Sequence, residues 1–343
     1  MFRKLFGFKK DNSPDEPTTK PRSVQLDSNQ QVQFLSLFTS PADVAKRLNA
    51  NHTALWEDKL GAPVFDVIAA LTDAELLREA TLSEKLEASF KLSELKEMAS
   101  SQGVKASGKK ADIAERIASS SRTGFCDELG GRNILICTDR AQDAVSEHKA
   151  AKKLDLERAQ LRTLELLRAR NFSEACNIVC RYEEAQFYQR GIGVNWKSAD
   201  QRLFKEITII FKANPGFHKS RYGGVSQASR ELAAMFSLWG TERFGRVISD
   251  ELLDNNDKNR VLAARMLLFF ARNKLQVDQA KRLSQGYRFE VLKVKDRNST
   301  CLACRSDDGH LYDLDNVPEL PHPDCNCEVG CRCNAVLVPP SNR

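Results

Sequence analysis

The chain has 343 residues, a formal net charge of +6 and a hydrophobic content of 41%. This length is enough for two or three domains, and the mildly basic charge permits nucleic acid as a partner without requiring it. No apolar run reaches the roughly 20 residues that a membrane-spanning helix needs, so we expect no membrane partner.

Residues 1–32 are polar, include Pro14, Pro17 and Pro21, and have little to bury. Such a composition is typical of a disordered segment, and we expect a disordered basic tail and linker here. The start, MFRKLFGFKK, is too short for the apolar region of a signal peptide, and no small-residue cleavage site follows. A weak amphipathic membrane anchor is the alternative. Because this start lacks the pattern of a signal peptide, we expect a cytoplasmic location.

Helical periodicity dominates residues 33–122. Ser40-Pro41-Ala42 predicts a helix start with proline in the first turn. The spacing of Val64, Phe65, Ile68 and Leu71 predicts an amphipathic helix that ends near Thr72, and Asp73 would start the next short helix. We expect this whole stretch to form one helical unit.

The segment at 91–120, KLSELKEMASSQGVKASGKKADIAERIASS, predicts two short helices joined by a tight turn. Leu92, Leu95 and Met98 recur at helical spacing on the first helix. Gly103 can end that helix because glycine tolerates a positive φ. A second apolar face carries Ile113, Ala114 and Ile117.

The second helix of this hairpin would start beside two lysines. Ser107 is placed to cap it, and Gly108-Lys109-Lys110 follows. A helix N-terminus presents backbone N–H groups and the positive end of the helix dipole, where acidic residues are usual. Lysines there instead predict a phosphate-sized positive site.

The run LSELKEMASSQGVKASGKKADIAERI resembles a SAP domain, a helix–extended turn–helix module. The resemblance implies binding to duplex DNA with weak sequence preference and some liking for A·T-rich tracts. The contacts that it implies are Lys105, Ser107, Gly108, Lys109 and Lys110, with Arg116 as a flanking contact. The alternative is a plain helical hairpin with a solvated basic turn.

After this hairpin, Asn133–Thr138 contains Ile-Leu-Ile-Cys and predicts a single strand or the end of a small wing. Residues 140–285 predict an all-helical domain without a catalytic constellation, which could be a scaffold or a surface for a protein partner. Four scattered cysteines are expected to be buried apolar residues: Cys126, Cys137, Cys176 and Cys180.

The C-terminal part, 286–343, begins with a predicted strand at Tyr287–Val294 and is rich in cysteine. Cys301-x-x-Cys304 has the spacing of a zinc knuckle. The candidates for the remaining ligands are His322, Cys325, Cys327, Cys331 and Cys333. Either some of these are spare or two metals share ligands, and spacing alone does not choose.

We prefer a zinc site made of Cys301, Cys304, Cys325 and either Cys333 or Cys331, with His322 as the main alternative. Disulfides in an exported protein are the competing interpretation, but the absence of an export signal favours metal. A hydrolytic zinc needs an open position and a nearby base. So many thiolates favour a closed, structural site instead.

The pattern C-L-A-C…D-G…L-P-H-P-D-C-N-C resembles the C-terminal tail of phage Mu F-like head-morphogenesis proteins. The resemblance implies a metal-stabilised β element. The insertion Glu328–Cys333 departs from that family's pattern.

We therefore expect a mainly α, multidomain protein: a SAP-like hairpin within 33–122, an all-helical domain at 140–285 and a zinc-binding β element at 286–343. The predicted function is DNA binding with a structural zinc. The alternatives are a nucleic-acid-processing enzyme targeted by the hairpin and a phage-derived head-assembly scaffold.

Overall fold

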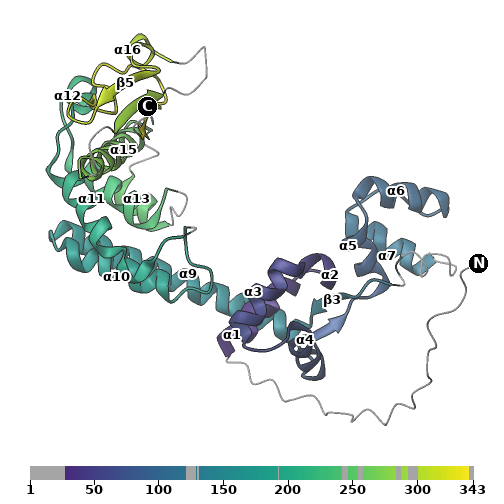
Figure 1. The fold of residues 1–343 in the computed structure, drawn as a ribbon. Helices are drawn as coiled ribbons and strands as arrows, with labels where there is room; N and C mark the ends of the chain where they lie inside the picture. The colour runs from purple at the N-terminus through teal and green to yellow at the C-terminus, as the bar shows by residue number, and fades with distance from the viewer. Residues whose placement is uncertain are drawn as a thin grey trace, which may run out of the picture. The chain divides into compact units, whose positions relative to one another are not determined.

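The computed structural model describes residues 28–120, 129, 131–191, 193–241, 246–253, 258–282, 287–292 and 300–339. The chain divides into two compact units, Met1–Ala151 and Lys152–Arg343 (Figure 1). The described residues are mainly helical, with two small antiparallel sheets, as the sequence predicts. Residues 1–27 of the predicted tail lie outside the described part. Residues 28–32, which we expected to belong to the linker, are instead the start of a helix.

The first unit contains short helices and one sheet. Its elements are α1 (Ser28–Leu35), η1 (Ser36–Phe38), β1 (Ala42–Asp43), α2 (Val44–Arg47), α3 (Ala50–Leu60), α4 (Val64–Asp73), β2 (Leu77–Glu79), α5 (Leu82–Ser89), α6 (Leu92–Ser101), α7 (Lys110–Ser120) and β3 (Ile134–Cys137). The strand predicted at Asn133–Thr138 is present as β3. It is the central strand of the sheet, with β1 and β2 antiparallel on either side.

Two of the short elements differ from the prediction. The chain at Ser40–Ala42 leads into β1 rather than a helix, and the Asp43 side chain caps α2 by accepting from the N–H of Ala45. A helix does not start at Asp73, because α4 continues to that residue. Glu75 then takes a positive φ of 54° and turns the chain into β2.

Helices α5, α6 and α7 share a small core of their own. Its fully buried side chains are Leu86, Leu95, Ala99, Ile113, Ala114 and Ile117. The apolar faces predicted for the hairpin are therefore present, although Leu92 at the start of α6 is 40% exposed. Thr81 and Glu84 form a capping box that fixes the start of α5.

The second unit is built on long helices. They are α9 (Asp139–Arg168, which begins in the first unit), α10 (Phe172–Glu184), α11 (Asp200–Lys212), α12 (Gly216–Tyr222), α13 (Gln227–Trp239), α14 (Arg246–Leu252) and α15 (Lys258–Ala280), with the short η2 (Trp196–Ser198). Helix α13 is buried along almost its whole length between its neighbours. In the described part, no helix is both long enough and apolar enough to cross a membrane.

The C-terminal sheet has the order β5-β4-β6, with β4 (Arg288–Leu292), β5 (His310–Asp313) and β6 (Asn334–Val338). The strand predicted at Tyr287–Val294 is present as β4. A common core joins this sheet to Phe217 of α12 and to Met266 and Ala280 of α15. The cysteine-rich element and the helices before it belong to the same compact unit, Lys152–Arg343.

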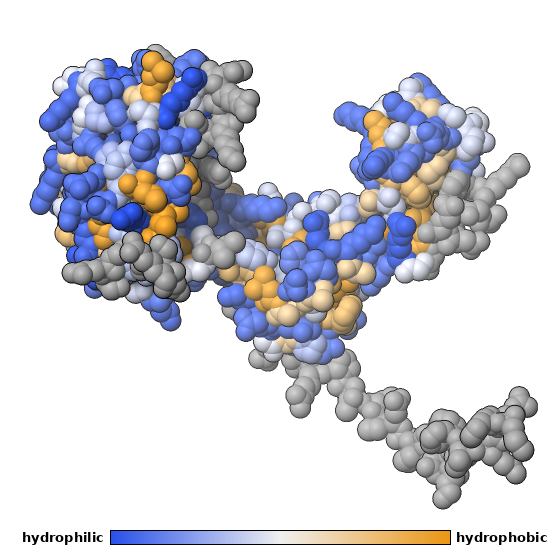
Figure 2. All heavy atoms as spheres, turned by 45° about the horizontal axis from the view of Figure 1, so that its top comes forward, coloured by the Kyte–Doolittle hydropathy of each residue, from blue (hydrophilic) through white to orange (hydrophobic). Residues whose placement is uncertain are grey.

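Hydrophilic residues cover most of the surface visible in Figure 2, with apolar side chains exposed in small patches between them. The cysteines outside the C-terminal part are buried where they are described: Cys137, Cys176 and Cys180 are free thiols in apolar surroundings. Burial raises the pKa of the Cys137 thiol to about 11, so this residue is a packing thiol rather than a reactive one. Cys126 lies outside the described residues.

Candidate metal centre and candidate DNA-binding turn

Six cysteine side chains gather beside the C-terminal sheet. Cys301 stands at the N-cap of the short helix α16 (Leu302–Ser306), which places Cys304 one helical turn later on the same side. The loop that follows β5 brings the other four: Cys325, Cys327, Cys331 and Cys333. Five of the six are buried, and Cys301 is partly exposed.

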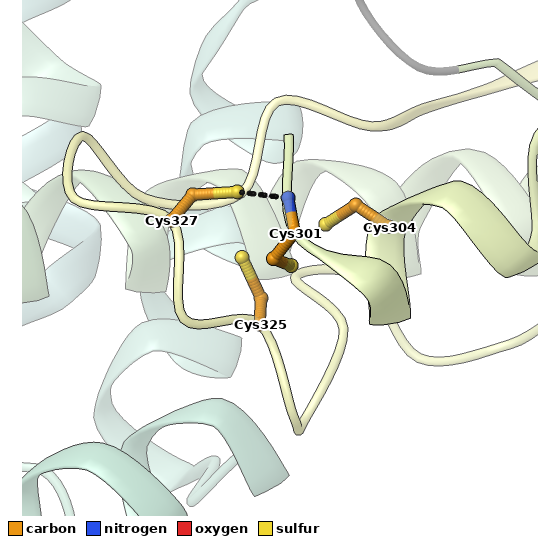
Figure 3. A group of neighbouring side chains, drawn as sticks. All are labelled: Cys301, Cys304, Cys325 and Cys327. Carbon is orange, nitrogen blue, oxygen red and sulfur yellow. Dashed lines mark hydrogen bonds between the residues drawn. The ribbon is translucent and has the colours of Figure 1, made fainter. Parts of the chain in front are cut away.

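The sulfur atoms form two overlapping groups. The Sγ atoms of Cys301, Cys304, Cys325 and Cys327 all lie within 4.8 Å of one another and point towards a common centre (Figure 3). Cys304, Cys331 and Cys333 form a second group within the same limit. Cys304 therefore belongs to both groups, and all six predicted cysteine ligands are brought together.

The spacing of the sulfur atoms suits a metal better than disulfides. A tetrahedral zinc with Zn–S bonds of about 2.3 Å separates its sulfur ligands by about 3.8 Å. The Sγ atoms of Cys304 and Cys331 are 3.7 Å apart. A disulfide would need about 2.05 Å, and all six cysteines are free thiols.

Backbone N–H groups point at several of these sulfur atoms. The Cys301 N–H donates to Cys327 Sγ at 3.3 Å. Burial acts to raise the pKa of the Cys301 thiol, but hydrogen bonds from the N–H groups of Cys304 and Asn326, together with those from neighbouring thiols, bring this pKa down to about 7. Such donors stabilise a thiolate, which is the form that binds metal.

Hydrogen bonds between the thiols at the centre of the cluster shift their pKa values in opposite directions. Hydrogen bonds from Cys304 to Cys325, Cys331 and Cys333 raise the pKa of the Cys304 thiol, and the bond that reaches Cys331 lowers the pKa of that thiol well below its usual range. A divalent cation at this position would replace thiol protons and neutralise the negative charge more fully. The donor set therefore fits a thiophilic metal such as zinc.

Helix α12 fixes the loop that carries four of the cysteines. Arg221 donates through Nη1 to the carbonyl of Cys327 at 2.8 Å, and the Ser220 hydroxyl donates to the carbonyl of Pro323 at 2.5 Å. Gly330, with a φ of +86°, lets the loop approach α15 closely. A Cβ at this position would lie 2.8 Å from side-chain atoms of both Leu262 and Met266.

The structure does not bring His322 into either group. Its Nδ1 accepts a hydrogen bond from the Asp324 N–H at 3.1 Å, and its Nε2 lies 3.8 Å from the Asp307 carboxylate. Cys327 joins Cys301, Cys304 and Cys325 in the first group, whereas the preferred fourth ligands, Cys331 and Cys333, lie with Cys304 in the second. This grouping depends on the path of the loop, which the ligand spacing in the sequence does not determine.

The turn between α6 and α7, residues 102–109, presents the predicted DNA contacts at the surface. Lys105, Ser107, Gly108 and Lys109 are exposed, and Lys110 is half-buried. Gly103 has a φ of +70° at the end of α6, as expected, and Gly108 has a φ of +121°.

Arg116, the expected flanking contact, makes hydrogen bonds within the hairpin. Its guanidinium donates to the carbonyl of Lys105 and, at 2.5 Å, to that of Ser107. Its Nε donates to the carbonyl of Asp112 at 2.9 Å. Arg116 therefore holds the turn against α7, and no sequence signal distinguished this role from a contact with DNA.

The start of α7 differs in two details from what we expected from the sequence. Helix α7 begins at Lys110, so its N-cap position is Lys109 and not Ser107. The Asp112 carboxylate accepts from the Lys109 N–H at 3.2 Å. The first turn thus has an acidic residue beside the lysine pair, which makes the positive site weaker than lysines alone would.

Comparisons of this chain with protein-family models, with curated proteins and with solved structures find no match.

Proposed function

We propose that this protein binds duplex DNA through the turn between α6 and α7, and that its C-terminal cysteines hold zinc in a structural role. The DNA-binding part of this proposal is supported by a turn that Arg116 holds through hydrogen bonds and that exposes lysine side chains. Arg116 fixes the turn through two of its backbone carbonyls, those of Lys105 and Ser107, while Lys105 and Lys109 are exposed.

A turn of this kind suits the phosphate backbone of a duplex. Phosphate oxygens accept from lysine and from backbone N–H groups at helix N-termini, and such contacts have little dependence on sequence. Gly108 has no side chain, so the backbone beside the lysines can approach a phosphate closely. The nearby Asp112 keeps the local charge moderate, which favours weak, sequence-tolerant binding.

The thiolate-rich donor set supports a structural metal over a catalytic one. Four sulfur ligands can complete a tetrahedral zinc without a bound water, whereas hydrolytic sites usually keep three protein ligands and one open position. Among the described residues, the His310 and His322 side chains are outside both sulfur groups. Zinc would then stabilise the sheet and the loop on α12 and α15.

Fluorescence anisotropy with labelled duplexes tests the DNA part. Lys109→Glu plus Lys110→Glu should weaken binding to unrelated and A·T-rich duplexes alike, because it removes two cations and adds two anions at the phosphate site. Lys96→Glu plus Arg140→Glu changes the net charge equally at exposed positions outside the turn and should weaken binding much less. Equal losses in the two variants would reject the turn as the DNA site.

Metal analysis of the freshly reduced full chain tests the zinc part. We expect zinc in the purified protein and its loss in Cys301→Ser plus Cys304→Ser. Protein without zinc, or with all six cysteines oxidised, would contradict this. The zinc-loaded chain should also fail to cleave single- or double-stranded DNA and RNA, with or without magnesium. Cleavage that disappears on zinc removal while the fold survives would favour a nucleic-acid-processing enzyme.

A further inference from the structure

We propose that the six cysteines bind two zinc ions, bridged by the thiolates of Cys304 and Cys325. This inference rests on the proposed zinc-binding role and specifies its stoichiometry and connectivity. It also assigns a ligand function to Cys331 and Cys333, which a single tetrahedral site built on the first sulfur group would leave unused.

The number of thiolate ligands favours two zinc ions over one. Two tetrahedral ions need eight ligand positions, and six thiolates fill eight positions only when two of them bridge. One ion would use four thiolates and leave two sulfur atoms beside it without metal. Cys331 and Cys333 would then be those two, and they are only 3% and 2% exposed.

The sulfur positions show which two cysteines bridge. Cys304 belongs to both sulfur groups, so its Sγ atom faces both metal positions. Cys325 is the best placed of the remaining members of the first group to be the second bridge. It is buried and its Sγ lies within 4.8 Å of Cys304 Sγ, whereas Cys301 is partly exposed and the Sγ atom of Cys327 accepts from the Cys301 N–H. Cys301 and Cys327 would be terminal ligands of one ion, and Cys331 and Cys333 terminal ligands of the other.

The second position is the less complete of the two. Cys325 is not within 4.8 Å of all three sulfur atoms of the second group, so binding of the second ion would draw its side chain inward. The separation of 3.7 Å between Cys304 and Cys331 already matches the edge of a zinc tetrahedron, about 3.8 Å.

The negative charge of the thiolates also favours two zinc ions over one. Six thiolates, five of them buried, would keep four negative charges with one divalent ion, which is very costly in an apolar core unless some sulfur atoms keep protons. A second zinc removes two of those charges and lets every sulfur bind metal. The N–H donors on Cys301 and Cys327 and the Arg221 contact at the Cys327 carbonyl offset part of the remainder.

Native mass spectrometry of the reduced full chain, purified with zinc, gives the direct test. We expect two zinc ions per chain. X-ray absorption at the zinc edge should show sulfur as the nearest neighbour and a second zinc within about 4 Å. One zinc per chain would overturn the inference while leaving the proposed structural zinc intact, and no zinc would reject both. Two zinc ions per chain with no second zinc detected within about 4 Å of the first would show that no thiolate bridges them.

Paired variants separate a bridged pair from a single site. Cys331→Ser plus Cys333→Ser should reduce the content from two ions to one, and so should Cys301→Ser plus Cys327→Ser, because each leaves the bridging thiolates and one terminal pair. A single site at the first group predicts that the former variant keeps the wild-type content and that the latter loses all zinc.

Substituting a bridging cysteine should affect both zinc ions, unlike substituting a pair of terminal ligands. Cys304→Ser should weaken both sites and abolish the zinc–zinc distance, whereas Cys180→Ala, a buried free cysteine on α10 outside the cluster, should keep two ions. If a serine variant does not fold, the number of zinc ions and the zinc–zinc distance in the unmodified chain still distinguish a bridged pair from a single site. A Cys304→Ser protein that keeps both ions at a short distance would refute the assignment.

Discussion

Replacing Arg116 tests whether the proposed binding of DNA depends on the turn being held in place. Its three hydrogen bonds all end on backbone carbonyls, two of them in the turn. A typical net contribution is about 0.5–1.5 kcal/mol per hydrogen bond, and the side chain is only half-buried. For the two bonds that end in the turn, we therefore assign about 1 kcal/mol to its order, at the low end of that range. Arg116→Ala should then weaken duplex binding by about fivefold.

The salt dependence shows how this loss arises. Each phosphate contact contributes about −0.9 to the slope of log K against log salt concentration. Lys109→Ala should reduce the magnitude of that slope by about 0.9. Arg116→Ala should leave the slope unchanged while lowering affinity at every salt concentration, because it removes a support for the turn and not a phosphate contact.

Arg116→Lys is the matched control for charge. Lysine keeps the positive charge but lacks the planar fork that reaches two carbonyls at once, so this variant should bind as weakly as Arg116→Ala. If Arg116→Lys restores wild-type binding, or if Arg116→Ala lowers the slope by about one, Arg116 contacts DNA directly and our interpretation of the turn is wrong.

Other changes test further parts of the structure. Gly108→Ala should destabilise the hairpin by about 1–3 kcal/mol in thermal unfolding, because a residue with φ of +121° would place Cβ 3.1 Å from Arg116 Nη2. Gly103→Ala, with open space around its Cβ, should cost only about 1 kcal/mol. Gly330→Ala should lower the stability of the second unit by a similar 1–3 kcal/mol through its contact with Met266, and an unchanged melting temperature would contradict the close packing on α15. Zinc removal by a chelator should raise hydrogen exchange in the cysteine loop and in α12 together, while the β1–β3–β2 sheet keeps its protection; loss confined to the loop would contradict the shared core.

The helices could be predicted from the sequence because apolar residues recur at helical spacing over several turns. The buried faces of α6 and α7, with Leu95, Ile113 and Ile117, follow this pattern directly. Strands β1 and β2 could not be predicted, since two or three residues are too few to show alternation. They form only because β3 lies between them and pairs with both.

The proximity of the six cysteines could be predicted, but not their grouping. Six cysteines in one short stretch favour a metal site as the hypothesis before the fold is known. Which sulfur atoms meet depends on the path of the loop after β5, and that path depends on long-range contacts such as Arg221 with the Cys327 carbonyl. The support that Arg116 gives to the turn was missed for the same reason, because its carbonyl partners are nine and eleven residues away.

The position of β6 has a consequence for folding kinetics. Its first residue, Asn334, pairs with Leu292 of β4 and directly follows Cys333. Closing the chain between these two strands without a cross-link would cost about 3 kcal/mol of loop entropy, and metal bound at Cys333, as we propose, would bring β6 to its partner already in position. If the proposed zinc binding holds, zinc supply should set how fast the sheet forms. While zinc is scarce, one edge of β4 would stay unpaired and offer its backbone groups to other chains, the condition under which newly made protein aggregates.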